Sequence, residues 1–434
     1  MHILLLCGGP GRRLWPISNG TRAKQYLRLL QAPDGRRESM VERMVRQLRT
    51  SLPGVAMTAV APAPQLDALR AQLGAGVPVI IEQERRGTCP AIALAVTSML
   101  EQKRISADEP VIAVPCDTFT DSGYFRALRL MAEAVKEKKA PLVLMGVPAR
   151  EPSPRYGYIL PSPGAEQESL CSVARFAEKP AAADAAALIA RGAFWNAGVF
   201  AFLPSFLTPL SALLASPGSF DRNVAERTKG AMCVPYCGEW QDLGTWEALS
   251  LLLPQQAIGN THVEASRGCT VINELNIPLL LHGASGLIVA ASPDGILVAD
   301  KSVSASIKDE VDRLAARPMY EERRWGVYKV VDTAEFPDGY SALTKQLTLN
   351  PGCSISYQRH THRDEVWTFI DGTGTIVLDG ESHSVGRGDV VRIPRGQKHA
   401  LLAHTPLTFI EVQTGSHLVE EDIERFPFEW PETC

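Results

Sequence analysis

The 434-residue sequence lacks several features that mark other protein classes. No apolar run approaches the roughly 18 residues that a membrane-spanning helix needs. The opening MHILLL has no basic stretch before it and no small-residue cleavage site after it, so it is interpreted as a buried strand rather than a signal peptide. The nine cysteines contain no CxxC pair, and the closest two, Cys233 and Cys237, are interpreted as core or surface thiols. We therefore expect a cytoplasmic protein without a disulfide framework and without a membrane partner.

An excess of positive charge is also missing. The chain has 44 lysines and arginines against 48 aspartates and glutamates, a net charge of −4. This balance gives no support to nucleic-acid binding through bulk electrostatics. The sequence also shows no internal repeat and no low-complexity segment, which leaves an ordinary globular protein of two or three domains.

The charge is nevertheless uneven, because the first acidic residue is Asp34. Residues 7–16 read CGGPGRRLWP, and the bare backbone of such a stretch lets N–H groups approach phosphate oxygens closely. A structural turn is the alternative interpretation of this glycine-rich stretch. The nearby cations favour an anionic ligand. The glycines are Gly8, Gly9 and Gly11, and the cations before Asp34 are Arg12, Arg13, Arg22, Lys24 and Arg28.

The first 255 residues alternate apolar runs with helical patterns. Apolar runs occur at residues 3–6, 58–61, 78–81, 111–114 and 142–147, with helical stretches between them, for example at 39–48, 63–72 and 91–102. This alternation is typical of an α/β domain with a mostly parallel sheet covered on both faces. Ligands of such sheets bind beyond the carboxyl ends of the strands, where residues 7–13 are expected.

Two further regions follow. Residues 256–320 contain short β-type segments separated by Gly, Asn and Asp turns, and residues 307–316 have the pattern of a short amphipathic helix. Residues 321–434 contain strands at regular spacing with turns at NPG, DGTG, DGE and GRGD, which predicts a small antiparallel barrel or sandwich. We expect domains at 1–255 and 321–434, joined by a β-rich, β-helix-like linker at 256–320.

The barrel region carries a candidate metal site. In an extended strand, Gln358, His360 and His362 would share one face, and Glu365 follows shortly after. His399 offers a further ligand from a separate strand. Imidazole and carboxylate groups suit Zn²⁺, Fe²⁺, Mn²⁺ or Ni²⁺. The alternative is a metal-free barrel with polar interior residues.

The N-terminal motifs resemble those of sugar-1-phosphate nucleotidyltransferases, and especially of mannose-1-phosphate guanylyltransferases. GGPGRRLWPIS followed by AKQYLRL is similar to the family pattern GGSGTRLWPLS…PKQFL. RRGTCPAIALA, VPCDTF, RYGYI, FAEKP, FWNAGVFAF, SFDRNVAER and WQDLGTW continue the resemblance in order. It implies a Rossmann-like nucleotidyltransferase domain and a dimeric protein with GTP and mannose 1-phosphate as substrates.

The resemblance also implies roles for particular residues. The catalytic group would be Arg13, Lys24, Asp117 and Asp242, of which Asp117 and Asp242 would hold Mg²⁺. The nucleotide would contact Gly8, Gly9, Gly11, Arg12, Gly87 and Thr88, and the sugar phosphate would contact Gly157, Glu178, Lys179, Asn196 and Asp221. Without the resemblance, Asp117 would be interpreted as a helix cap and Lys179 as a solvated turn charge.

The sequence departs from the family pattern at several positions near these residues. Arg12 replaces a Thr, Gly87 replaces an Asn, Arg22-Ala23 replaces Tyr-Pro before the lysine, and Thr118 replaces a His. Because the family places this loop near the nucleobase, the departure at Gly87 bears on the choice of GTP over another nucleotide and not on the reaction type.

The C-terminal region resembles a cupin, and more closely the mannose-6-phosphate isomerase domain fused to guanylyltransferases in bifunctional enzymes. RRWGVY, PGCSISYQRHTHRDEVW, IPRGQKHAL and IEVQTGSHLVEEDIERF follow the family pattern from residue 323 to 426. Val366 replaces a family His in this segment. The resemblance implies interconversion of mannose 6-phosphate and fructose 6-phosphate and a divalent transition metal, which we expect to be Zn²⁺. Lys345 and Arg425 are candidate contacts for the phosphate or the rest of the substrate, with solvent-exposed surface charges as the alternative interpretation.

Two functional hypotheses follow. The first is a bifunctional guanylyltransferase and isomerase. The second is a sugar-1-phosphate nucleotidyltransferase of different sugar or base specificity, whose cupin is a non-catalytic sugar-binding, metal-binding or dimerising module.

Overall fold

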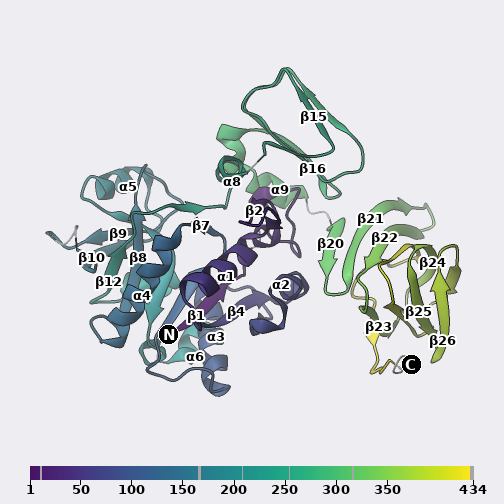
Figure 1. Ribbon diagram of the computed structural model, residues 1–434, viewed down its shortest axis with the longest axis horizontal. Coiled ribbons are helices and arrows are strands. Elements are labelled where there is room, and N and C mark those ends of the chain that lie inside the picture. Colours follow the sequence, from purple (N-terminus) through teal and green to yellow (C-terminus); the bar gives the residue numbers. More distant parts are fainter. Residues whose placement is uncertain (10–11, 165–167, 208, 254, 315–316, 431–434) are drawn as a thin grey trace.

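The computed structural model describes residues 1–9, 12–164, 168–207, 209–253, 255–314 and 317–430. Three regions follow one another along the chain: an α/β domain, a coil of short parallel strands, and a β-barrel (Figure 1). Among the helices of the described residues, none combines the length and the apolar character that crossing a bilayer requires.

A nine-stranded sheet forms the centre of the α/β domain. Its first four strands are parallel, as expected, but β11 runs antiparallel to both β6 and β8, so the sheet is mixed. In sheet order the strands are β5 (Val79–Glu82), β4 (Ala56–Pro62), β1 (His2–Leu6), β6 (Val111–Pro115), β11 (Phe194–Phe202), β8 (Leu142–Pro148), β12 (Met232–Pro235), β10 (Cys171–Ala177) and β9 (Tyr158–Pro161).

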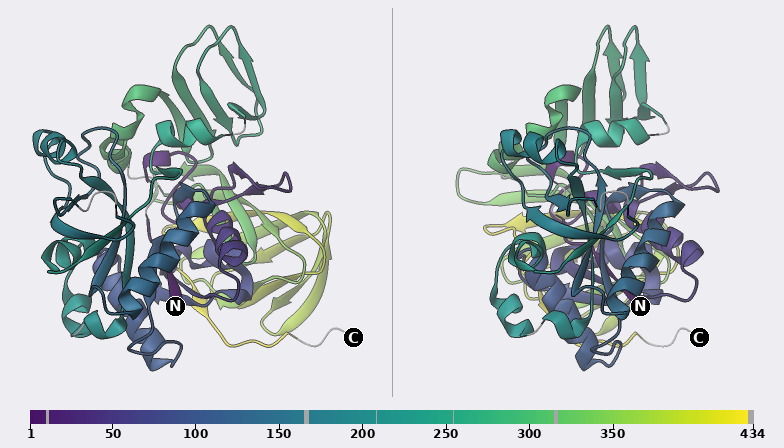
Figure 2. Two further views of the ribbon diagram at one scale, coloured as in Figure 1. Left: turned by 60° about the vertical axis from the view of Figure 1, so that its left-hand side comes forward. Right: turned by 90° about the vertical axis from the view of Figure 1, so that its left-hand side faces the viewer.

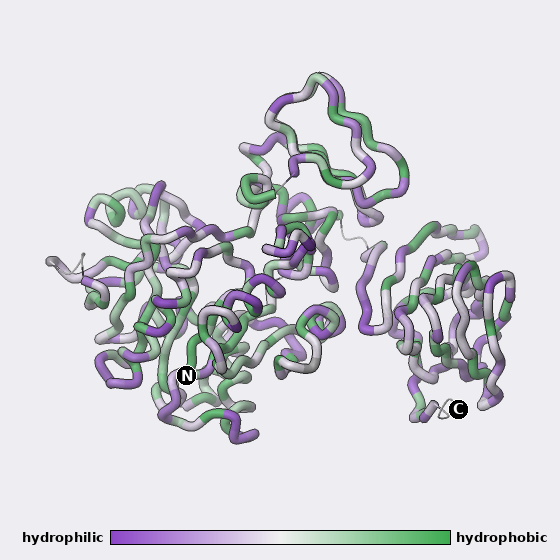
Figure 3. Tube along the Cα trace, viewed as in Figure 1, coloured by the Kyte–Doolittle hydropathy of each residue, from purple (hydrophilic) through white to green (hydrophobic). Residues whose placement is uncertain are grey.

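Helices cover both faces of this sheet, because its central strands are apolar on both sides. Ile3 and Leu5 of β1 pack with α1, α2 and α4, whereas Leu4 faces α3 on the opposite side. Figure 3 shows the hydrophobic residues running along these inner strands. The helices are α1 (Met40–Ser51), α2 (Leu66–Leu73), α3 (Thr88–Glu101), α4 (Ser122–Lys136), α5 (Ala182–Ile189), α6 (Leu210–Ala215), α7 (Phe220–Asn223) and α8 (Trp246–Leu252).

The segment after α8 winds into stacked coils, which project at the top of both views in Figure 2. Strands β14, β16 and β18 are parallel neighbours, and β15 pairs in parallel with β17. This arrangement is the expected β-helix-like linker, closed by the antiparallel strand β19 and by the helix α9 (Lys308–Leu314). Its strands are β14 (Ala257–Gly259), β15 (Thr261–Glu264), β16 (Thr270–Asn273), β17 (Leu279–His282), β18 (Leu287–Ser292) and β19 (Gly295–Asp300).

Two antiparallel sheets form the C-terminal barrel around a core that contains Trp367, Phe369 and Phe409. The larger sheet has the order β20 (Tyr320–Arg323), β21 (Gly326–Glu335), β22 (Ser341–Leu349), β29 (Leu407–Gly415), β24 (Arg363–Asp371) and β27 (Val390–Ile393). The smaller one has the order β26 (Glu381–Gly386), β25 (Thr373–Leu378), β28 (His399–Ala403), β23 (Ser354–Arg359) and β30 (Glu424–Arg425).

Candidate active site and candidate metal centre

The N-terminal candidate site lies at the carboxyl ends of β1 and β6. Gly8 and Gly9 follow β1, and Asp117 follows β6. Asp242 comes from far along the chain, but β13 (Trp240–Asp242) pairs antiparallel with β7 (Thr118–Thr120) and aligns Asp242 with Thr118. This small two-stranded ribbon therefore brings the second carboxylate beside the first.

Lys24 joins the two carboxylates. Its Nζ lies 2.6 Å from Asp117 Oδ2 and 3.5 Å from Asp242 Oδ1, with 12% of the side chain exposed. Burial alone would lower the pKa of Lys24, but Asp117 and Asp242 outweigh it and raise the pKa above its ordinary value. The ammonium group is therefore fully charged at neutral pH, and the two carboxylates form a pair of hard oxygen donors that suits Mg²⁺.

Two cavities meet at Asp117. The larger, of about 500 Å³, is lined by Gly8, Gly9, Glu82, Arg85, Gly87 and Thr88 among others. The smaller, of about 200 Å³, contains the predicted sugar-phosphate residues, namely Gly157, Glu178, Lys179, Asn196 and Asp221. Asp117 lines both cavities, and Asp242 lines the smaller one. The geometry thus offers two adjoining compartments, with Asp117 at their junction and Lys24 paired with it.

The conformation of Gly87 explains why a glycine stands there. Its φ is +112°, and a Cβ atom would lie 2.2 Å from the carbonyl oxygen of Gly218. An asparagine therefore does not fit at this position without movement of the backbone. The next residue, Thr88, begins α3, and its Oγ1 accepts a hydrogen bond of 2.9 Å from the N–H of Phe220.

The smaller cavity is lined by paired polar groups. Lys179 Nζ lies 2.9 Å from Glu178 Oε1, and Asn196 Nδ2 donates to Asp221 Oδ1 at 2.5 Å. Burial, followed by the charge of Glu178, raises the pKa of Asp221 to about 6. A Cβ atom on Gly157 would lie 2.9 Å from Glu178 Oε2 and 2.9 Å from Phe176 Cζ, so a larger residue here would require these side chains to shift.

The predicted phosphate cations are less clustered than the sequence indicates. Gly11 lies outside the described residues. Arg13 is exposed in the short 3-10 helix η1 (Arg12–Leu14), and Arg12 forms an ion pair with Asp312 of α9. Arg85, to which the sequence analysis gave no role, lines the larger cavity and donates to the carbonyl oxygen of Gly8. Its position within the RRGT motif was the available signal.

In the barrel, His360, Glu365 and His399 form the candidate metal centre. One ligand atom of each lies within 4.8 Å of the other two, and all three residues are buried. His360 Nδ1 faces the carbonyl oxygen of Asp422 at 2.5 Å, and His399 Nδ1 faces that of Gln397 at 3.1 Å. Since each Nδ1 then carries the proton, each Nε2 keeps a lone pair for a metal.

The Nε2 atom of His399 supports this assignment. It is buried and has no hydrogen-bond partner among the described residues, and Glu365 Oε2 lies 3.7 Å away. Burial lowers the pKa of both histidines, which keeps the rings neutral. Burial opposes ionisation of Glu365, but the two histidines and Arg363 outweigh it and lower the pKa of the carboxyl. Neutral imidazoles with an ionised carboxylate fit a divalent transition metal.

Gln358 lies next to this cluster, whereas His362 does not. Gln358 Nε2 is 3.4 Å from His360 Nε2. The prediction that His362 shares this face fails geometrically, because β23 ends at Arg359 and the alternation of side chains ends with it. His362 is exposed and packs edge-to-face against His417.

Arg363, to which the sequence analysis gave no role, occupies the inner position instead. Its Nε lies 2.8 Å from Glu365 Oε1, and its Nη2 lies 3.3 Å from His360 Nε2. The guanidinium is buried and also donates to the carbonyl oxygen of Val419 at 2.9 Å. A resident positive charge therefore borders the metal centre.

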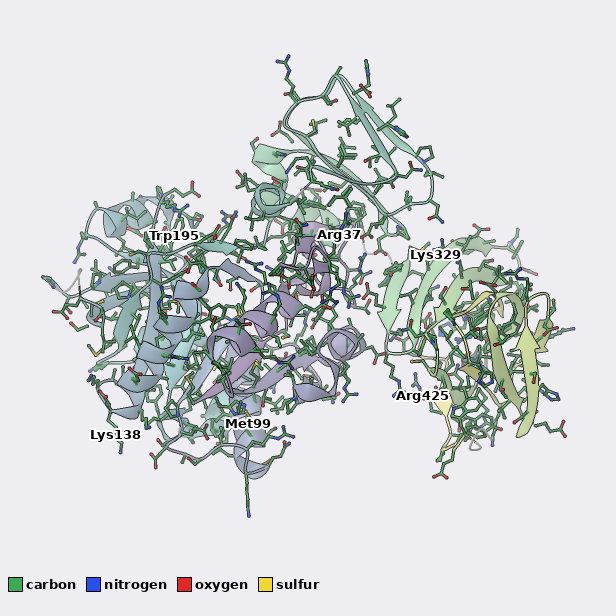
Figure 4. The ribbon with its side chains drawn as sticks, viewed as in Figure 1. Arg37, Met99, Lys138, Trp195, Lys329 and Arg425 are labelled. Carbon is green, nitrogen blue, oxygen red and sulfur yellow. The ribbon has the colours of Figure 1, made fainter. Side chains whose placement is uncertain are left out.

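A cavity of about 880 Å³ opens beside the metal centre and is lined by Gln358, Arg363, Lys345 and Arg425 among others. Lys345 Nζ pairs with Glu420 at 2.6 Å. Burial, followed by the charge of Glu365, raises the pKa of Glu411 in this cavity to about 8. Figure 4 labels Arg425, which lies on the side of the barrel toward the α/β domain. The cavity thus combines a candidate metal centre, cations and a titratable carboxyl.

Comparison with known proteins places the chain in a family. Residues 2–255 match the family described as Nucleotidyl transferase, which covers more than half of the chain. This chain belongs to that family. Residues 312–427 match the family described as Mannose-6-phosphate isomerase C-terminal. The protein is thus a nucleotidyltransferase with an isomerase-type cupin domain, and the predicted fold class is confirmed.

Individual relatives align with this chain over almost its full length. The chain is 30% identical to the alginate biosynthesis protein AlgA of Pseudomonas putida, covering 98% of this chain and 95% of that protein. It is 30% identical to a mannose-1-phosphate guanylyltransferase of Escherichia coli, covering 98% of each chain. A solved structure described as mannose-1-phosphate geranyltransferase from Thermus thermophilus is 27% identical, with a TM-score of 0.61, and covers 73% of this chain and 99% of that one. The predicted resemblance to guanylyltransferases is confirmed.

Proposed function

We propose that this nucleotidyltransferase transfers a guanylyl group from GTP to mannose 1-phosphate, giving GDP-mannose and pyrophosphate. The observation that carries the proposal is Lys24, held between Asp117, which lines both cavities, and Asp242, which lines the smaller one. A relative in Escherichia coli that bears the name mannose-1-phosphate guanylyltransferase supports the choice of substrates.

In the proposed reaction, a phosphate oxygen of mannose 1-phosphate attacks the α-phosphorus of GTP. A new P–O bond forms as the bond between the α-phosphorus and its bridging oxygen breaks, and that oxygen leaves with pyrophosphate. Lys24 would neutralise charge near the α-phosphate, and Arg13 would steady the departing pyrophosphate. Positioning and charge neutralisation supply most of the acceleration in such transfers.

Mg²⁺, when bound, would neutralise phosphate charge, and Asp117 and Asp242 would hold it. Because Lys24 shares the same carboxylates, binding of the metal and the nucleotide would direct its ammonium toward a phosphate oxygen. Gly8 and Gly9 would offer backbone N–H groups to the phosphates.

The remaining site residues divide between the two substrates. The triphosphate and nucleoside would lie in the larger cavity, with Gly11, Gly87 and Thr88 as the remaining contacts. Arg12 is left out of this set, because it pairs with Asp312. Lys179 would pair with the sugar phosphate, while Glu178, Asn196 and Asp221 would hydrogen-bond to sugar hydroxyls beside Gly157.

For the barrel we propose isomerisation of mannose 6-phosphate and fructose 6-phosphate with Zn²⁺. Gln358, His360, Glu365 and His399 would hold the metal, which when bound would polarise sugar oxygens. Lys345 and Arg425 would contact the phosphate or the sugar. We leave His362 out of this ligand set, since it is exposed and turned toward His417.

A second candidate function for the barrel rests on Arg363. Its guanidinium lies 2.8 Å from Glu365 and 3.3 Å from His360, where it would repel a divalent cation. This favours a cupin that binds sugar phosphate without catalysis. Release of fructose 6-phosphate from mannose 6-phosphate by the metal-loaded protein would decide for the isomerase, and its absence for the binding module.

Substitution of Asp242, which pairs with Lys24, tests the proposed transfer reaction. Asp242→Asn should lower the kcat of GDP-mannose formation by about 100-fold or more, since it removes one carboxylate from the charged centre. Asp108→Asn, an exposed aspartate on the same domain, is the matched control and should leave the rate unchanged. Product formation is followed by chromatography of GDP-mannose. Full activity in Asp242→Asn would contradict the proposed site.

We further propose a cytoplasmic homodimer. The free thiols at all eight cysteines of the described residues support a reducing compartment. Exposed apolar side chains on the linker, Leu280, Ile296 and Val298, support association of two copies. Light scattering of the purified protein measures the mass in solution, and a mass near the monomer's would reject the dimer.

A further inference from the structure

The segment that leads to Lys24 has little regular structure of its own. Residues 18–23 form no helix or strand, and η2 (Lys24–Tyr26) begins only at the lysine itself. The position of the Lys24 ammonium therefore depends on the contacts that hold this loop in place. Most of the polar contacts that the loop makes with the rest of the protein come from residues more than 250 positions later in the sequence.

Arg22 makes the strongest of these contacts. Its Nη1 and Nη2 donate to the two carboxylate oxygens of Glu274 at 2.8 and 3.1 Å, and its Nε lies 3.2 Å from Glu322 Oε1. The guanidinium also lies 4.9 Å from the ring centroid of Tyr320. Only 14% of the Arg22 side chain is exposed, so these are sheltered interactions and not surface ion pairs.

The partners of Arg22 belong to two different regions. Glu274 follows β16 of the linker, and Tyr320 and Glu322 lie in β20 of the barrel. Asn19 adds to the same connection, because its Nδ2 donates to Asp294 Oδ2 and to the Tyr320 carbonyl oxygen, each at 2.9 Å. The loop is thus held from the C-terminal side of the chain.

From Arg22 the chain runs directly into the reactive centre. Ala23 is buried, Lys24 reaches Asp117 and Asp242, and Gln25 Nε2 donates to the Cys7 carbonyl oxygen at 2.8 Å. Because only Ala23 separates Arg22 from Lys24, a displacement of Arg22 would also displace the Lys24 ammonium group. Misplacement of a reacting group by about 1 Å can cost about 100-fold in rate.

We propose that Arg22 is a positioning residue for nucleotidyl transfer: it fixes Lys24 by bridging the linker at Glu274 and the barrel at Glu322. The inference rests on the proposed role of Lys24. It means that the linker and the barrel complete the transferase site without touching either substrate. Arg22 itself touches neither Asp117 nor Asp242 and acts only through the loop.

The test compares Arg22→Gln with Arg36→Gln in the full-length protein. Arg36 is the matched control, because it pairs with Asp34 within the α/β domain and its side chain is 84% exposed, so Arg36→Gln should leave kcat unchanged. Arg22→Gln should lower kcat by about 10- to 100-fold with a smaller change in the KM for GTP, and Arg22→Lys should restore part of the rate. A normal kcat in Arg22→Gln would overturn the proposal.

A double mutant separates positioning from general destabilisation. If Arg22 acts through Lys24, the residual rate of the double variant Arg22→Gln, Lys24→Gln equals that of Lys24→Gln alone. If the double variant instead loses rate by the product of the two single-variant factors, the proposal is overturned. If Lys24→Gln keeps full activity, the proposed function fails at Lys24. If Lys24→Gln is inactive and Arg22→Gln is normal, only the positioning role fails.

Glu322→Gln provides the same test with less risk to folding, because Arg22 keeps its bidentate pair with Glu274. It should lower kcat by about three- to tenfold with an unchanged unfolding temperature. A wild-type kcat in this variant would contradict the bridge to the barrel.

Discussion

The ionised carboxylate of Asp221 is unfavourably buried in the smaller cavity, so replacing Asp221 by Asn should stabilise the protein. Burial and the neighbouring Glu178 raise its pKa from 3.8 to about 6. Asp221→Asn removes the charge and keeps an oxygen that can accept the hydrogen bond from Asn196. Above pH 6 the variant should therefore be more stable than the wild type.

The size of the effect follows from the pKa. A rise of about two units corresponds to about 3 kcal/mol, at about 1.4 kcal/mol per unit. Because the folded pKa of this acid lies above the unfolded one, its contribution to the wild-type stability falls as the pH rises from about 4 to about 6. The advantage of the Asn variant should accordingly grow by about 1.4 kcal/mol between pH 5 and pH 8.

Thermal unfolding of both proteins at pH 5 and pH 8 measures this difference. For a domain of this size, about 1 kcal/mol corresponds to about 2–4 °C. Asp184→Asn, an exposed aspartate on α5, is the control and should show no pH-dependent gain. A variant no more stable than the wild type at pH 8, or a gain equal at both pH values, would refute the reasoning. The KM for mannose 1-phosphate should rise in Asp221→Asn, because the lost charge faces the sugar.

Two further predictions concern single residues. Gly87→Ala should destabilise the protein by about 3 kcal/mol or more in urea unfolding, because of its positive φ and the 2.2 Å approach to Gly218, whereas Gly20→Ala, with open space around it, should change stability by about 0.5 kcal/mol or less. His399→Gln should abolish binding of Zn²⁺ to the barrel, measured by elemental analysis after dialysis, whereas His362→Gln should retain it. Equal metal content in these two histidine variants would reject the ligand set.

Short motifs in a fixed order led to Lys24, Asp117 and Asp242 as candidate site residues, and the structure places the three side chains together. Strand pairing brings the two aspartates close, and Lys24 contacts both. The apolar runs predicted as strands at 3–6 and 111–114 correspond to β1 and β6 in the structure. Long apolar runs report burial, and burial of both faces defines the centre of such a sheet.

The sequence pattern could not predict the antiparallel direction of β11 or the exposed position of His362. Composition does not reveal whether a strand runs parallel or antiparallel, because this depends on its connections, and β11 reverses the sheet. Alternation predicts the face of His362 only while the strand continues, and β23 ends three residues earlier.

Long-range ion pairs could not be predicted either. Arg12 and Arg22 were grouped with the phosphate cations because they are close in sequence. Their partners Asp312 and Glu274 lie 300 and 252 residues away, and nothing local indicates them. Arg12 and Arg22 therefore connect the N-terminal segment to later regions of the chain, whereas Lys24 pairs with Asp117 and Asp242.

Pyrophosphate release by the purified protein with Mg²⁺ and mannose 1-phosphate tests the central claim most directly, with GTP, ATP, UTP and CTP compared in parallel. The proposed function predicts release with GTP well above that with the other three nucleotides. Release with another nucleotide instead, or none in the presence of mannose 1-phosphate, would contradict it.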